Sequence, residues 1–256
     1  MAISSFYKNL AQKGAFRFNE ACSMLSSHEV ASVYLYRLME KGLIRRVRKN
    51  LYVVIDLASG CDAVDKNVIA THISESSFVS YHSAFEFYGF YNQVRNDVQV
   101  SSLTSFQEFN DKGILYRSFK TSNLCQVERV KGVMVSTIER TIIDSINKLG
   151  ASMDTGELLK CLELVPFCEE EKLEEMLVTY DKDVLYRKSG YILSYFKETL
   201  GLSNGFFDFC KKHSNRGNSG RLAPKEEPDL KYVKEWGLYG YRDILRLISK
   251  IEDIDA

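Results

Sequence analysis

The sequence predicts an α+β protein, with a small basic domain at the N-terminus and a larger mixed domain after it. Residues 26–54 run in the order helix cap, amphipathic helix, glycine, strand, basic turn, strand. The chain is neutral overall, yet residues 1–60 hold nine Lys/Arg against four Asp/Glu, and the remainder holds 25 against 30. Beyond residue 65, strand-like segments come first and helical segments dominate later, which favours α+β over an alternating parallel fold.

An amphipathic helix is expected over residues 27–41. Ser26 and Glu29 have the S-x-x-E spacing of a capping box, and Gly42 stands where a left-handed residue ends a helix. Apolar side chains at i, i+3, i+4 and i+7 predict one buried face, made of Ala31, Tyr34, Leu35 and Leu38. The opposite face is expected to be exposed and carries His28, Ser32, Val33, Tyr36 and Arg37.

A two-stranded hairpin is expected directly after this helix. Residues 43–47 and 51–54 are rich in β-formers, and Arg48-Lys49-Asn50 separate them. Asn50 suits the left-handed conformation of a tight turn. A helix followed by a basic hairpin is the second half of a winged helix-turn-helix, in which the hairpin, residues 43–54, is the wing. The competing interpretation is a solvated amphipathic helix with a basic surface hairpin.

The predicted DNA-binding residues divide into two groups. The helix would read base edges, with Arg37 donating two bonds to guanine, Ser32 bonding several edges and Val33 touching a thymine methyl. The wing would contact phosphates, which gives salt-dependent affinity without sequence information. The complete set is Ser27, His28, Ser32, Val33, Tyr36, Arg37, Arg45, Arg46, Arg48, Lys49 and Asn50.

The first 25 residues complete the N-terminal module. A helix over Ile3–Lys13 is expected to end at Gly14, and residues 16–18 form a brief strand. Asn19 would cap a second short helix over residues 20–25. The sequence therefore predicts a DNA-binding domain over residues 1–57, a polar linker near 56–68, and a second domain over 65–256.

The second domain is expected to mix short strands with helices. The box Ser136-x-x-Glu139 predicts a helix with Ile138, Ile142, Ile146 and Leu149 on one face. Residues 209–225 contain five Lys/Arg and no acid, and are expected to form a flexible basic loop. Helices are expected over 66–73, 80–88, 154–164, 169–180, 183–200 and 241–251, and strands over 98–101, 114–116, 126–130 and 132–136.

Enzymatic, metal-binding and membrane functions find little support in the sequence. Six cysteines without a C-x-x-C pair favour buried thiols in a reducing cytoplasm. No apolar run approaches the ~18 residues of a membrane span. Glu139, Arg140 and Asp144 suggest a helix cap and an i, i+4 ion pair rather than catalysis. We therefore expect no catalytic residues, no metal and no cofactor.

Four segments resemble the AbiEi antitoxins of type IV toxin–antitoxin systems, which act in phage defence. One segment is the helix end and wing, 38–52, where Lys49-Asn50 stands in place of the family's usual Arg-Gly. The others are Phe78–Ala84 followed by Tyr88-Gly89, Val135–Asp144, and Tyr186–Leu193 with a weaker similarity at Lys234–Leu238. The matching segments follow the family's order along most of the chain.

The resemblance implies a function that the residues alone do not give. Such antitoxins repress their own operon by binding inverted repeats in double-stranded DNA through the N-terminal domain. Their C-terminal domain counteracts a nucleotidyltransferase toxin without a stable complex. The chain would then be a monomer or weak dimer that pairs on DNA. Two alternatives are a stand-alone regulator with a ligand-sensing C-terminal domain, and a nucleic-acid-processing enzyme that docks through the winged domain.

Overall fold

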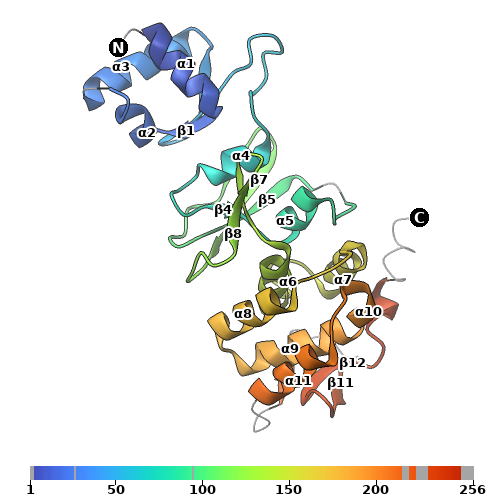
Figure 1. The fold of residues 1–256 in the computed structure, drawn as a ribbon. Helices are drawn as coiled ribbons and strands as arrows, with labels where there is room; N and C mark the ends of the chain where they lie inside the picture. The colour runs from blue at the N-terminus through green and yellow to red at the C-terminus, as the bar shows by residue number, and fades with distance from the viewer. Residues whose placement is uncertain (1–2, 26, 94, 215–218, 223–229, 249–256) are drawn as a thin grey trace. The chain divides into compact units, whose positions relative to one another are not determined.

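The fold is α+β, as the sequence predicts. The computed structural model describes residues 3–25, 27–93, 95–214, 219–222 and 230–248 (Figure 1). Its contacts divide the chain into two compact units, Met1–Val79 with Arg95–Val135, and Ser80–Val94 with Ser136–Ala256. We call these the first and second units. The expected division between residues 57 and 65 stays a prediction.

The N-terminal part of the first unit has the element order of a winged helix-turn-helix (Figure 1). Its strands pair antiparallel in the order β1-β3-β2. The elements are α1 (Ile3–Lys13), β1 (Ala15–Arg17), α2 (Phe18–Cys22), α3 (His28–Glu40), β2 (Ile44–Arg48) and β3 (Leu51–Val54).

One apolar core holds these elements together. The buried face of α3 is the expected one, with Ala31, Leu35 and Leu38 buried and Tyr34 half-buried. Tyr34 meets the ring of Phe6 edge to face, with 5.7 Å between ring centroids. Buried residues from all three strands and from α1, α2 and α3 complete the core: Phe6, Leu10, Phe16, Ala21, Leu35, Leu38, Ile44, Tyr52 and Val54.

The caps of α2 and α3 differ from the expected ones. Helix α3 begins after Ser27, whose Oγ accepts the N–H of Val30 at 3.2 Å, and Ser26 lies outside the described residues. Helix α2 begins at Phe18 rather than after Asn19, because the Glu20 carboxylate accepts the N–H of Arg17 at 2.8 Å. A carboxylate one turn inside the helix therefore caps it.

The end of α3 and the turn of the wing take the expected conformations. Gly42 has φ +66°, and the N–H groups of Gly42 and Leu43 donate to the carbonyls of Met39 and Leu38. This is the Schellman pattern that a left-handed glycine permits. Asn50 has φ +67°, so it supplies the left-handed turn residue between β2 and β3.

The rest of the first unit is a six-stranded mixed sheet with a short helix. The strand order is β6-β7-β5-β4-β9-β8, with β5–β7 and β4–β9 parallel and β6–β7 and β4–β5 antiparallel. Asp65 caps the helix through the N–H groups of Asn67 and Val68. The elements are α4 (Lys66–Thr71), β4 (Phe78–Val79), β5 (Asp97–Ser102), β6 (Phe109–Asp111), β7 (Ile114–Lys120), β8 (Val127–Val130) and β9 (Val133–Ser136).

The second unit is mainly helical, with one small sheet (Figure 1). In that sheet β12 lies between β10 and β11, parallel to the first and antiparallel to the second. The elements are α5 (Tyr81–Tyr88), α6 (Ile138–Asn147), α7 (Thr155–Leu164), α8 (Glu170–Tyr180), α9 (Asp183–Ser194), α10 (Lys197–Leu200), α11 (Asn204–His213), β10 (Gly220–Arg221), β11 (Leu230–Val233) and β12 (Leu238–Tyr241).

Three expectations for the second unit are wrong in part. The helix expected over 183–200 is two helices, since the chain turns at Tyr195 and Phe196, where Phe196 is buried. Residues 209–213 of the expected basic loop belong to α11, which Ser203 caps through the N–H of Gly205. The remainder of that loop includes 215–218 and 223–225, which lie outside the described residues. Of the helix expected over 241–251, the first residue, Tyr241, belongs to strand β12, and residues 249–251 lie outside the described residues.

Within the part of the chain that the structure describes, no helix has the length and apolar character needed to span a membrane.

Candidate nucleic-acid interface

Helix α3 turns one polar and aromatic face outward. The predicted base-reading residues His28, Ser32, Val33, Tyr36 and Arg37 are all exposed, and 59% of Tyr36 and 47% of Val33 is accessible. The accessible side chains of Val33 and Tyr36 are therefore available for contact with another molecule. Since these residues are exposed and the major groove of B-DNA admits an α-helix, this face has the form needed to enter that groove.

The chemistry of this face is partly set by contacts within the helix. The Ser32 hydroxyl donates to the carbonyl of His28 at 3.0 Å, so its oxygen remains an acceptor for an amino group on a base edge. The His28 ring meets Phe18 edge to face, with 5.8 Å between centroids. Ser27 is half-buried and its Oγ is occupied by the helix cap, so its contribution is to hold the first turn.

The tip of the wing presents cations to solvent. Lys49 and Asn50 form the turn between β2 and β3, and both are exposed, as is Arg46 on β2. The Asn50 carbonyl accepts the N–H of Phe18 at 3.0 Å, which ties the turn to the start of α2. The Arg46 Nε donates to the carbonyl of Arg48 at 3.2 Å.

Arg45, by contrast, is engaged by two carboxylates. Its Nε donates to Asp62 Oδ1 at 2.7 Å, and its Nη1 and Nη2 donate to the two oxygens of Asp111, both at 2.7 Å. The Lys112 ammonium group donates to the same oxygen, Asp62 Oδ1, at 3.0 Å. Burial alone would raise the pKa of Asp62, but the bonds from Arg45 and Lys112 outweigh it and hold that pKa below its usual value. We call these four residues the Arg45 cluster.

Arg48 is held by aromatic rings. Its guanidinium carbon lies 4.6 Å from the centroid of Phe109 and 5.8 Å from that of Phe106. Its Nη1 donates to the carbonyl of Gln107 at 3.2 Å. Phe109 is the first residue of the β6–β7 hairpin, residues 109–120, which belongs to the six-stranded sheet, and Phe106 lies three residues before it. Partial burial lowers the pKa of Arg48 from its ordinary value.

The partners of Arg45 and Arg48 were not among the predicted site residues. Asp111 is 66 residues from Arg45, and Gln107 is 59 from Arg48. Asp111 lies in the segment Asn110-Asp111-Lys112-Gly113, which reads as an ordinary turn. A single sequence carries no signal that pairs such distant positions.

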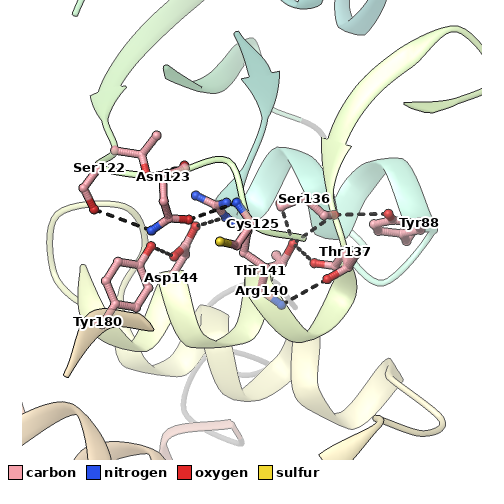
Figure 2. A network of polar contacts seen from close by, with 11 residues as sticks. Tyr88, Ser122, Asn123, Cys125, Ser136, Thr137, Arg140, Thr141, Asp144 and Tyr180 are labelled. Carbon is pink, nitrogen blue, oxygen red and sulfur yellow. Dashed lines mark hydrogen bonds and ion pairs between the residues drawn. The ribbon is translucent and has the colours of Figure 1, made fainter. Parts of the chain in front are cut away.

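The segment Val135–Asp144 forms a buried polar network at the start of α6 (Figure 2). Thr137, not Ser136, caps the helix by accepting the N–H of Arg140 at 3.3 Å, while the Ser136 and Thr141 hydroxyls bond each other at 2.7 Å. Glu139 is buried and accepts the N–H of Glu169 at 3.2 Å, so it does not complete the expected capping box.

Arg140 and Asp144 form the expected i, i+4 pair, but inside the second unit rather than on its surface. The Arg140 Nε lies 3.2 Å from Asp144 Oδ2, and the two side chains are 0% and 3% exposed. The Tyr180 hydroxyl donates to the other oxygen of Asp144 (Figure 2). Burial raises the pKa of Asp144, while Arg140 and Tyr180 oppose the rise. Because these buried groups bond one another, their role is to stabilise the packing of α6.

The segment Tyr186–Leu193 contacts residues 236–241, which overlap the segment Lys234–Leu238 with the weaker similarity to the family. The Arg187 Nη1 donates to the carbonyl of Gly237 at 2.8 Å, and the Tyr191 hydroxyl donates to the carbonyl of Tyr241. Gly190 faces Trp236, which is buried. These contacts attach the β11–β12 hairpin to α9.

The element order, the exposed face of α3 and the basic wing define the N-terminal part as a winged helix-turn-helix of the class that transcriptional regulators use. Residues 5–55 match the family described as transcriptional regulator, AbiEi antitoxin. The resemblance drawn from the sequence is therefore confirmed in this part of the chain.

The whole chain also resembles a solved structure. The crystal structure of the RV2827C protein from Mycobacterium tuberculosis superposes with a TM-score of 0.65, covering 98% of this chain and 93% of that one. Since the two sequences are 11% identical, the likeness concerns the fold alone. No curated protein matches the chain in sequence.

Proposed function

We propose that this protein is a transcriptional autorepressor and antitoxin, which binds inverted repeats in its operon promoter and counteracts a nucleotidyltransferase toxin. The observation that carries the proposal is the outward face of α3 beside a basic wing, in the segment that matches the AbiEi regulator family. The net positive charge of residues 1–60 supports the same partner, because phosphate neutralisation dominates the affinity of proteins for DNA.

The helix would supply sequence preference. Arg37 is exposed one turn after Val33, so its guanidinium can reach a guanine in the groove while Val33 contacts a thymine methyl. A good bidentate base contact contributes about 1–3 kcal/mol of discrimination. One protomer would read each half-site, with half-sites about 10 base pairs apart or a multiple of that distance when two protomers meet on the DNA.

The remainder of the chain would carry the antitoxin function, without catalysis, and in the cytoplasm. The network around Arg140 and Asp144 supports a packing role for these residues rather than a catalytic one, because its donors and acceptors are turned toward one another and buried. The toxin need not form a stable complex with the protein.

The DNA-binding part is tested with purified full-length protein and a duplex from its own promoter. We expect Arg37→Ala to lower the preference for the operator over a scrambled duplex by about 1–3 kcal/mol, measured by fluorescence anisotropy, while the salt dependence is kept. Lys234→Ala, on an exposed lysine of the second unit, is the matched control. Equal affinity of the unsubstituted protein for both duplexes would contradict operator recognition.

A second candidate, a regulator that senses a small ligand, is favoured by one cavity in the second unit. It holds about 250 Å³ and is lined by Phe90, Tyr91, Glu157 and Lys160 among others. This volume is below the range of about 300–1,000 Å³ of most ligand sites, and Glu157 already accepts a bond from Tyr91 at 3.3 Å. Absence of a neighbouring nucleotidyltransferase gene would support this candidate over the antitoxin.

A further inference from the structure

We infer that the four cations of the wing have two different roles: Arg46 and Lys49 contact DNA phosphates, whereas Arg45 and Arg48 position the wing on the β6–β7 hairpin. The inference rests on the proposed DNA-binding function and specifies it. It makes the sheet hairpin a part of the DNA-binding apparatus.

The Arg45 cluster is electrically balanced. Arg45 and Lys112 supply two positive charges and Asp62 and Asp111 two negative ones, all within hydrogen-bonding distance. Four hydrogen bonds from the guanidinium to these carboxylates fix its plane. A phosphate would have to displace a carboxylate to receive a bidentate contact, and the cluster as a whole offers it little attraction. Arg45 therefore attaches the wing to the hairpin.

Arg48 makes the second attachment, farther toward the tip of the wing. A guanidinium stacked on an aromatic face is stabilised by about 0.5–1 kcal/mol at exposed sites. Arg48 is stacked on Phe109 and also bonded to the Gln107 carbonyl, so a move toward a phosphate would break both contacts. Together Arg45 and Arg48 hold β2 at two points, one by charge pairing and one by stacking.

Arg46 and Lys49 differ from this pair in their surroundings. Both are exposed, and among the described residues neither forms an ion pair with a carboxylate. Lys49 is at the tip of the wing, where its ammonium group can approach the DNA backbone from several directions. Arg48 also keeps its charge, but among the described residues Arg46 and Lys49 are the two wing cations that neither a carboxylate nor an aromatic ring holds in place.

The two roles predict different dependence on salt. Each phosphate contact to duplex DNA contributes about 0.9 to the slope of log affinity against log salt concentration. We expect Arg46→Ala and Lys49→Ala each to flatten the slope by about that amount. Arg45→Met and Phe109→Ala should lower affinity at every salt concentration and leave the slope unchanged. Arg48→Ala should behave like Phe109→Ala, and the double variant should be no weaker than either.

The Asp111→Asn variant separates the two interpretations of Arg45 without removing a cation. If Arg45 attaches the wing to the hairpin, the loss of one carboxylate loosens the wing and lowers affinity, although the cluster gains a net positive charge. If Arg45 contacts phosphate, the same change releases its charge, which raises affinity and steepens the slope. Melting temperatures identify any variant that fails to fold. If Arg45→Met or Arg48→Ala fails to fold, Asp111→Asn and Phe109→Ala decide whether these arginines position the wing or contact phosphate.

The measurement is fluorescence anisotropy of the full-length protein with operator and scrambled duplexes, at several salt concentrations between about 50 and 200 mM. The inference is wrong, while the proposed function stands, if Arg45→Met or Arg48→Ala flattens the salt-dependence slope by about one. The same holds if Arg46→Ala and Lys49→Ala leave that slope unchanged. If the unsubstituted protein binds neither duplex with salt dependence, the proposed function fails along with it.

Discussion

Gly190 and Trp236 show at the scale of single residues why the α9 segment needs a glycine. A Cβ atom built on Gly190 would lie 2.0 Å from Cζ3 and 2.3 Å from Cη2 of the indole. Trp236 is 5% exposed, so its ring cannot move aside without disturbing Phe207 and the β11–β12 hairpin. Backbone conformation is not the reason, since Gly190 is in an ordinary helix.

We therefore expect Gly190→Ala to lower the free energy of unfolding by about 1–3 kcal/mol, the usual cost of overpacking a core. Urea unfolding followed by Trp236 fluorescence measures it, because this is the single tryptophan of the chain. Gly205→Ala is the matched control, as its new Cβ would meet only the Ser203 Oγ, at 3.1 Å. A similar loss in both variants would contradict the packing argument.

Asp62 makes a pH-dependent contribution to stability. Its folded-state pKa is lowered, so the contribution is present above the unfolded pKa of about 3.9 and is lost as pH falls through the folded value. We expect Asp62→Asn to lose about 1 kcal/mol at pH 7, because its partner Arg45 is partly accessible to solvent. The difference from the unsubstituted protein, measured by thermal unfolding at a series of pH values, should shrink as the pH falls below about 3.9. Asp208→Asn, on an exposed position of α11, should show no such trend.

At the scale of elements, α6 is organised by a buried charge pair. Removal of one partner leaves the other charge uncompensated in the interior, at a cost of about 3–5 kcal/mol, whereas apolar replacement of both can be neutral. Arg140→Met should therefore destabilise the protein by that amount. Arg140→Met with Asp144→Leu should recover most of the loss, although Tyr180 then lacks its acceptor. Additive losses in chemical denaturation would contradict this account of the pair.

The elements also show which features a sequence can predict. Left-handed turns at Gly42 and Asn50 follow from local chemistry, and so does the periodic face of α3. The break between α9 and α10 does not, because it depends on where Phe196 can be buried. The same holds for the wing: the cations are visible in the sequence, but their assignment to carboxylates, rings or solvent depends on a hairpin some 60 residues away.

At the scale of the whole molecule, the proposed function assigns repression and antitoxicity to different parts of the chain. The proposed DNA contacts come from α3 and the wing, and none comes from the second unit. Arg37 and Lys49 are exposed and lie outside the core of the winged domain, so both can be replaced without loss of folding.

Full-length protein carrying Arg37→Ala and Lys49→Ala should therefore lose repression and keep antitoxicity. A promoter–reporter fusion measures the first, and growth on co-expression with the neighbouring nucleotidyltransferase gene measures the second. Lys231→Ala, on an exposed lysine of β11 outside the segments that resemble the family, serves as the control for both assays. If the double variant also fails to restore growth while its melting temperature is unchanged, neutralisation acts through DNA binding, and the division of labour is wrong. If even the unsubstituted protein does not restore growth, the antitoxin proposal falls and a ligand-sensing regulator becomes the better explanation of the same fold.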